Sequence, residues 1–134
     1  MVKHLSVLAV TFLGGMTLMA QLPPVTGDRS SPLQTLTVAG ENNIGVRNAV
    51  MRNQSDVRVL RVVVEPGGTR VTHAHDDVKF HMFIPISAPM QLEVEGQQPV
   101  NVAPWHPFYM PKGTRHGFHN TSASPVEILE VFVK

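Results

Sequence analysis

Histidines are concentrated in one part of this sequence of 134 residues. Six of the seven lie between His73 and His119. Imidazole nitrogens bind transition metals and transfer protons near neutral pH, so this stretch is the candidate for chemistry. His73 and His75 are two residues apart, and in a β-strand residues at this spacing point to the same face. We therefore expect them to be the first two ligands of a metal ion, against the alternative of two polar residues on a solvent-facing strand.

A third histidine follows a turn signal. Pro111 fixes its own φ, and Gly113 can adopt a positive φ without steric cost, so the two residues predict a tight turn. His116 then enters a strand, and we expect the turn to direct its imidazole toward the first two. The three histidines would form a facial set of ligands for one ion: His73, His75 and His116.

These two segments resemble the two motifs of the cupin superfamily. The first motif is a glycine, five residues and His-x-His, and Gly67 followed by His73-Ala-His75 matches it. The second motif includes Pro-x-Gly, two residues, His, three residues and Asn. Four residues match it in type and spacing: Pro111, Gly113, His116 and Asn120. The resemblance covers residues 57–133 and implies an all-β fold, the double-stranded β-helix or jelly-roll barrel, with a divalent transition metal inside it.

The sequence departs from the first motif at its metal-binding glutamate. That glutamate is expected at position 79 or 80, where this chain has Lys79 and Phe80. A protonated lysine has no lone pair, so Lys79 cannot simply replace a carboxylate ligand. Motif glycines are also missing near residue 86 and at Trp105, which affects turns only. Two interpretations of the fourth ligand position remain: an open site for water or substrate, or participation of His81.

Three residues are candidates for catalysis besides the metal ligands. His81 is two residues from Lys79 and would lie on the same face of a strand. We expect His81 to be either a fourth ligand, an acid–base or supporting group, or a packed histidine. Lys79 would neutralise an anionic substrate, pair with Asp76, Asp77 or Glu93, or extend from the barrel mouth into solvent. Tyr109 or His81 could carry protons. The only cofactor implied is the metal, which would be Fe(II), Mn, Ni, Zn or Cu.

Three classes of function follow from the resemblance. The first is a metal-dependent enzyme, either dioxygenase-like or an isomerase or lyase, that acts on a small polar metabolite. The second is a protein that binds a metal or small ligand without catalysis. The third is a cupin whose metal site has lapsed, with Lys79 at the position of the ligand. Fold alone does not choose among them.

The elements that must position these residues are short strands. We count about ten apolar or alternating runs separated by turn signals, and no helix, which predicts an all-β barrel in one domain over residues 35–134. Residues 56–65 form the clearest strand and end at Pro66-Gly67-Gly68, a strong turn signal, before a separate strand over residues 71–75. The resemblance also implies a homodimer, with residues 35–50 as the pairing arm.

Composition limits the possible cross-links, metal ligands and partners. The chain has no cysteine, so it has neither disulfides nor thiolate ligands. The net charge of +1 and the lack of a basic patch give no indication of a nucleic-acid partner, which leaves a small molecule as the expected ligand.

The N-terminus predicts export. An apolar run over residues 5–13 follows Lys3, and small Ala20 precedes Gln21, which is typical of a secretory signal peptide. We expect residues 1–20 to be removed, residues 21–34 to form a flexible lead-in, and the mature protein to be periplasmic or secreted in a bacterium, without stable membrane insertion. The alternative is an uncleaved membrane anchor. An intact N-terminus in the mass spectrum of the native protein would contradict cleavage.

Overall fold

The computed structural model describes residues 35–134, which fold entirely as strands and loops. The predicted signal peptide over residues 1–20 and the lead-in over residues 21–34 lie outside the described residues. Within residues 35–134, no helix is long and apolar enough to cross a membrane. The strands are β1 (Thr37–Val38), β2 (Ile44–Asn53), β3 (Val57–His73), β4 (Phe80–Pro85), β5 (Met90–Val94), β6 (Val100–Val102), β7 (Phe108–Pro111), β8 (His116–His119) and β9 (Val126–Val133).

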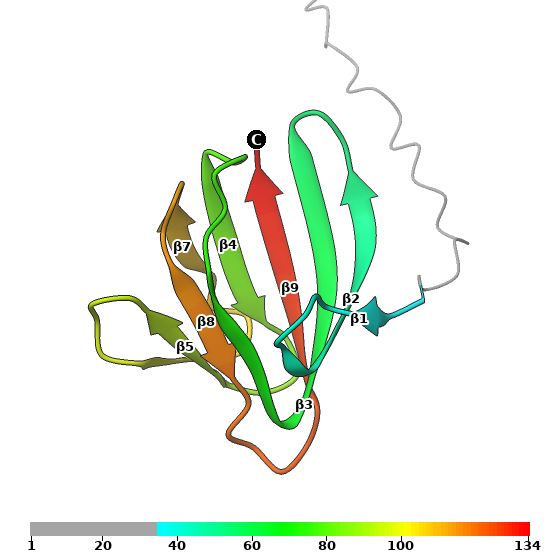
Figure 1. Ribbon diagram of the computed structural model, residues 1–134, viewed down its shortest axis with the longest axis vertical. Helices are drawn as coiled ribbons and strands as arrows, with labels where there is room; N and C mark the ends of the chain where they lie inside the picture. Colours follow the sequence, from blue (N-terminus) through cyan, green and yellow to red (C-terminus); the bar gives the residue numbers. More distant parts are fainter. Residues whose placement is uncertain (1–34) are drawn as a thin grey trace, which may run out of the picture. The chain divides into compact units, whose positions relative to one another are not determined.

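All nine strands of the described region belong to one antiparallel sheet (Figure 1). The order of its main path is β6-β5-β8-β3-β9-β4-β7, and β2 pairs with β3 off this path and carries β1. Strands that are distant in the sequence are therefore neighbours, as where β9 lies between β3 and β4. The sheet curls into a nearly closed barrel, and this architecture brings the two histidine segments together.

Strand β3 pairs with two different strands of the barrel, β9 and β8. Its first half, from Val57 to Val64, pairs with β9, whereas its last residues, from Thr69 to His73, pair with β8. The prediction of two strands separated by a turn at Pro66 was wrong, because this segment bends without leaving the sheet. Its backbone finds partners in Asn120, which accepts a hydrogen bond from the Gly67 amide at 3.0 Å and donates one to the Gly68 carbonyl at 2.9 Å.

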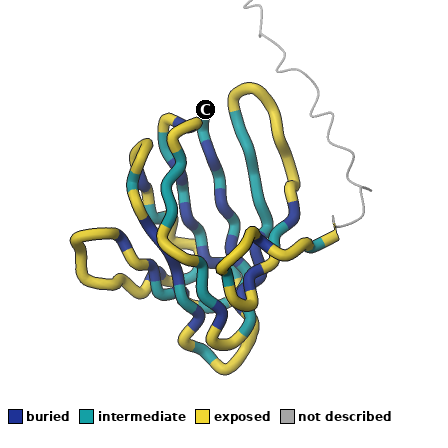
Figure 2. The backbone as a smooth tube through the Cα atoms, viewed as in Figure 1, coloured by how far each residue is buried: buried dark blue, intermediate teal, exposed yellow. Residues whose placement is uncertain are grey.

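The core lies inside the barrel, where alternate residues of each strand meet. In β9 every second side chain from Val126 to Phe132 is buried, and the intervening ones are half-buried. Figure 2 shows these buried positions along β4, β8 and β9, whereas the tip of the β2–β3 hairpin is exposed. Most of the interior is aliphatic or aromatic, but it also contains His81, His116 and Glu130. Three ionisable side chains in an apolar interior require an explanation, because buried charges are costly unless they are paired or bind a metal.

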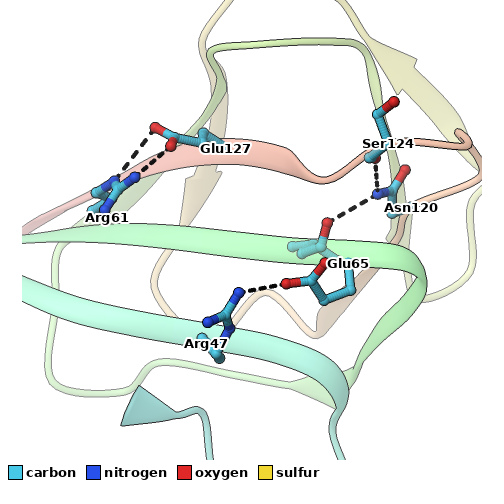
Figure 3. A network of polar contacts seen from close by, with 7 residues as sticks. Arg47, Arg61, Glu65, Asn120, Ser124 and Glu127 are labelled. Atoms are coloured by element: carbon cyan, nitrogen blue, oxygen red, sulfur yellow. Dashed lines mark hydrogen bonds and ion pairs between the residues drawn. The ribbon is translucent and has the colours of Figure 1, made fainter. Parts of the chain in front are cut away.

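Polar contacts join the strands around this core (Figure 3). Arg61 of β3 pairs with Glu127 of β9, and Arg47 of β2 pairs with Glu65 of β3. The buried Asn120 amide donates to the carbonyls of Val64 at 2.9 Å and Ser124 at 2.8 Å. Asn120 therefore ties the loop after β8 to β3, a structural role for this motif residue.

Candidate metal centre

The backbone places His73 and His116 opposite each other. His73 is the last residue of β3, His116 is the first of β8, and the two are direct partners in the antiparallel pairing. The predicted turn before β8 is present: Gly113 has a φ of 75°. The Gly113 amide donates a hydrogen bond of 3.0 Å to the carbonyl of His75, which joins the turn to the first histidine segment. His75 lies just beyond the end of β3, so this contact helps to fix its position.

The imidazoles of His73, His75 and His116 converge. Their ring centroids are 4.8 Å apart for His73 and His75, 4.5 Å for His73 and His116, and 5.5 Å for His75 and His116. One ring nitrogen from each lies within 4.8 Å of the others, which is close enough to hold one ion after small side-chain movements. The three residues proposed as ligands from the sequence thus form a group that is able to bind a metal.

Backbone carbonyls fix the tautomers of two of these rings. Nδ1 of His73 lies 2.9 Å from the carbonyl oxygen of Val71, and Nδ1 of His116 lies 2.9 Å from that of Thr114. A carbonyl can only accept, so in each case Nδ1–H is the donor and Nε2 carries the lone pair. Metal-binding histidines are commonly oriented by such a bond. The Nε2 atoms of His75 and His116 are buried and have no hydrogen-bond partner among the described residues.

Burial keeps these imidazoles neutral. It lowers the pKa of His73 and of His75 to about 4, and mutual repulsion with neighbouring imidazolium groups acts in the same direction. The pKa of His116 is also lowered, chiefly by burial. A protonated imidazole cannot bind a metal, so low pKa values leave the lone pairs available at neutral pH.

A second group of donors lies beside the first. His81 on β4 and Glu130 on β9 are only 2% and 6% exposed, and Nε2 of His81 is 3.6 Å from Oε1 of Glu130. With His116, which is 1% exposed, they offer three donor atoms within 4.8 Å of one another. His81 was considered as a ligand from the sequence, and its donor atom groups with those of Glu130 and His116, while its ring centroid also lies 5.1 Å from that of His75.

His81 and Glu130 are close enough to be an ion pair, but burial opposes their ionisation. It lowers the pKa of His81 to about 2 and raises the pKa of Glu130 to about 7. Both shifts favour the neutral form, and a separation of 3.6 Å is too long for a hydrogen bond. We therefore interpret the pair as two unpartnered polar groups, because desolvation outweighs their attraction at this distance.

Sequence reasoning missed Glu130 as a functional candidate. A signal was present, because Glu130 is two residues from both Ile128 and Phe132 in β9 and so lies on the same face as they do. A carboxylate on the apolar face of a strand is unusual and points to a partner inside the core. Glu130 also restores to the interior a carboxylate that the motif position, Lys79, lacks.

Lys79 and Tyr109 are not part of either group of donors. Lys79 is exposed and precedes the first residue of β4, so the strand parity that would direct it inward does not apply. It lines an open surface depression with Asp76, Asp77 and two other lysines. Tyr109 is 61% exposed, since its neighbour Met110 takes the inward position on β7. Their catalytic roles stay predictions.

Comparison with known proteins bears on this arrangement. The family model described as a cupin domain matches residues 60–132, which is more than half of the chain. The chain belongs to the cupin family. Among curated proteins, no sequence matches this cupin. Both sets of donor residues fall within the matched region.

Solved structures share the fold of this cupin. The polyketide cyclase RemF from Streptomyces resistomycificus is 17% identical, with 75% of this chain and 73% of that chain covered and a TM-score of 0.66. A predicted oxalate decarboxylase from Thermotoga maritima is 18% identical, with 75% and 90% covered and a TM-score of 0.65. A cupin domain from Bordetella pertussis is 24% identical, with 71% and 99% covered and a TM-score of 0.59. The predicted all-β jelly-roll class is confirmed.

Proposed function

We propose that this cupin binds a divalent transition metal through His73, His75 and His116 and uses it to transform a small polar molecule. The observation that carries the proposal is the set of unpartnered, neutral imidazoles inside the barrel. A buried polar atom without a partner costs about 1–3 kcal/mol, and Nε2 of both His75 and His116 is in this state. A bound ion would satisfy both atoms at once.

The residues around the triad make a dry and rigid setting. Phe132 stacks on His81 with ring centroids 4.3 Å apart and meets the edge of His75 at 4.7 Å. These contacts restrict the imidazoles and exclude water from one side of the site. A metal bound there would supply a Lewis acid or an oxygen-binding position. His81 lies next to His116, but its pKa of about 2 makes it a weak base, so we assign it no proton transfer.

Metal analysis tests the first part of the proposal. The protein is purified without added metal and its bound ions are measured, then it is stripped with a chelator and titrated with Fe(II), Mn, Ni, Zn and Cu by calorimetry. The His116→Ala variant should lose binding, because His116 contributes to both groups of donors. His106→Ala removes an exposed loop histidine and is the matched control. Equal affinity in the two variants would overturn the proposal.

A second candidate is a cupin that binds metal without catalysis. It is favoured by the exposed Lys79 at the position where the motif has a carboxylate ligand. Oxygen uptake and product formation with catechols, diketones and thiols distinguish the two. Turnover that is lost in His116→Ala supports the enzyme, whereas a bound metal with no turnover of any compound supports the binding protein.

A further inference from the structure

The second group of donors, His81, His116 and Glu130, comes from three different strands. They are β4, β8 and β9, and all three side chains are at least nine-tenths buried. Only His116 belongs to the cupin motifs. The β4–β9 pairing places Glu130 opposite Phe83 and Phe132 opposite His81, so Glu130 and His81 are diagonal neighbours on the inner face. The backbone therefore holds them together independently of His73 and His75.

The polar atoms of this group lack partners. Oε1 of Glu130, both ring nitrogens of His81 and Nε2 of His116 are buried without a hydrogen bond among the described residues. An uncompensated buried carboxylate is among the costliest arrangements in a protein interior. Two arginines are near enough to lower the pKa of Glu130, but both donate their hydrogen bonds to other groups. Arg58 contacts Asp77 at 3.1 Å, and Arg70 contacts the Ala39 carbonyl at 3.1 Å.

We propose that His81, His116 and Glu130 form a second, inner metal position in the barrel. Two neutral imidazoles and one carboxylate make a donor set that suits Fe(II), Mn or Zn. A divalent cation would compensate the carboxylate and satisfy the unpartnered nitrogens at once. This inner position rests on the proposed function only through His116, which it shares with the outer triad of His73, His75 and His116. His81 and Glu130 take no part in the outer triad.

The inner and outer positions exclude each other. Nδ1 of His116 donates to the Thr114 carbonyl, so Nε2 offers the only lone pair of this ring. One lone pair binds one ion at about 2.1 Å. The barrel therefore holds a single ion, either on three imidazoles or on two imidazoles and Glu130, and His116 selects between them.

Variants that remove one position at a time test the proposal. His75→Ala impairs the outer position, Glu130→Gln impairs the inner one with little change of shape, and His116→Ala impairs both. Glu93→Gln, on an exposed glutamate of β5, is the matched control for the carboxylate. The proteins are stripped and titrated with Co(II), whose visible spectrum reports the ligand set, and with Cu(II), whose electron paramagnetic resonance reports the coordinating nitrogens. Circular dichroism checks folding, and His73→Ala replaces His75→Ala if the latter does not fold.

We expect each single variant, His75→Ala and Glu130→Gln, to bind one Co(II) with a different spectrum. The double variant should lose binding as completely as His116→Ala. If His75→Ala is already as empty as His116→Ala, and Glu130→Gln behaves as Glu93→Gln, the inner position is overturned while the outer one stands. Strong binding by His75→Ala that Glu130→Gln abolishes in the same background supports the inner position even if the outer triad fails. Absence of binding in the wild type overturns both.

Discussion

Glu130 is a carboxylate in an interior that disfavours its charge. Burial raises its pKa to about 7, although Arg58 and Arg70 act in the opposite direction. In the unfolded chain the same group titrates near 4.5. The folded, metal-free protein therefore binds more protons than the unfolded chain between these two pH values, and stability falls as the pH rises through this window.

Glu130→Gln should remove this loss. We expect the variant to gain stability over the wild type as the pH rises from 4.5 to 7, reaching on the order of 3 kcal/mol, because one pKa unit corresponds to about 1.4 kcal/mol. Urea unfolding in the presence of chelator measures the difference at each pH. Protonation of the buried histidines also destabilises the fold as the pH falls. These histidines are present in both proteins, so their contribution cancels in the difference between the variant and the wild type. A difference that does not change with pH would contradict the assignment.

Single residues also show how far sequence reasoning reaches. The motif spacing was sufficient to select His73, His75 and His116 because local geometry, a strand end and a turn, positions each of them. It did not select Glu130, whose environment depends on which face of β9 points inward. The alternation along β9 places Glu130 on the face of Ile128 and Phe132, but only the pairing with β3 and β4 shows that this face points into the barrel.

At the scale of elements, the approach of β8 to β3 determines the distance between His116 and His73. Gly117 lies at this contact, where a Cβ atom would be 2.6 Å from the Arg70 carbonyl oxygen and 3.2 Å from the Thr72 amide nitrogen. Both neighbours are backbone atoms of β3, which cannot move aside as a flexible side chain would. A larger residue must therefore push the two strands apart.

Gly117→Ala should weaken metal binding without touching a ligand. The displaced β8 would carry the imidazole of His116 away from that of His73, and we expect an affinity loss of roughly tenfold or more, comparable to the loss of a supporting contact. Calorimetry with Zn(II) measures it. Gly96→Ala is the control, because a Cβ atom there meets nothing; its φ of 78° adds a local strain that Gly117, which has no positive φ, does not have. Equal affinities in both variants would show that the strand spacing is not critical.

The bend in β3 was read from the sequence as a break, and Asn120 explains why it is not one. Asn120→Ala should destabilise the fold by about 1–3 kcal/mol, since it leaves the buried Val64 carbonyl without its side-chain donor. Chemical unfolding compares it with Asn101→Ala, at an exposed position of β6. A loss no larger than that of the control would remove the role given to this side chain.

At the scale of the whole molecule, the all-β jelly roll was predicted from turn-bounded strands together with the motifs, whereas the strand boundaries, order and pairing required the structure. The predicted homodimer through residues 35–50 stays a prediction. Within residues 35–134, β1 covers only Arg47 and Asn48 of the outer edge of β2. Val38 and Ile44 beside this edge are 74% and 68% exposed. Exposed strand edges with apolar side chains are sites of pairing between chains.

Ile44→Glu should yield a monomer if this edge forms the dimer, because a charged side chain opposes burial between two chains. Light scattering after size exclusion measures the molar mass of the variant and the wild type. Val100→Glu, at an exposed apolar residue of β6, is the control and should leave the dimer intact. A wild type that is monomeric at all concentrations would contradict the predicted assembly.

Strand β9 follows every other strand in the chain, yet it lies between β3 and β4. A nascent chain on the ribosome therefore cannot close its barrel until residue 133 has emerged, and long-range pairings of this kind form slowly. Before that moment Glu130 of β9 cannot join His81 of β4 inside the barrel, although β3 and β8 pair directly with each other. An ion bound at the proposed inner position would therefore be acquired after synthesis, and its identity would reflect which metals surround the finished protein.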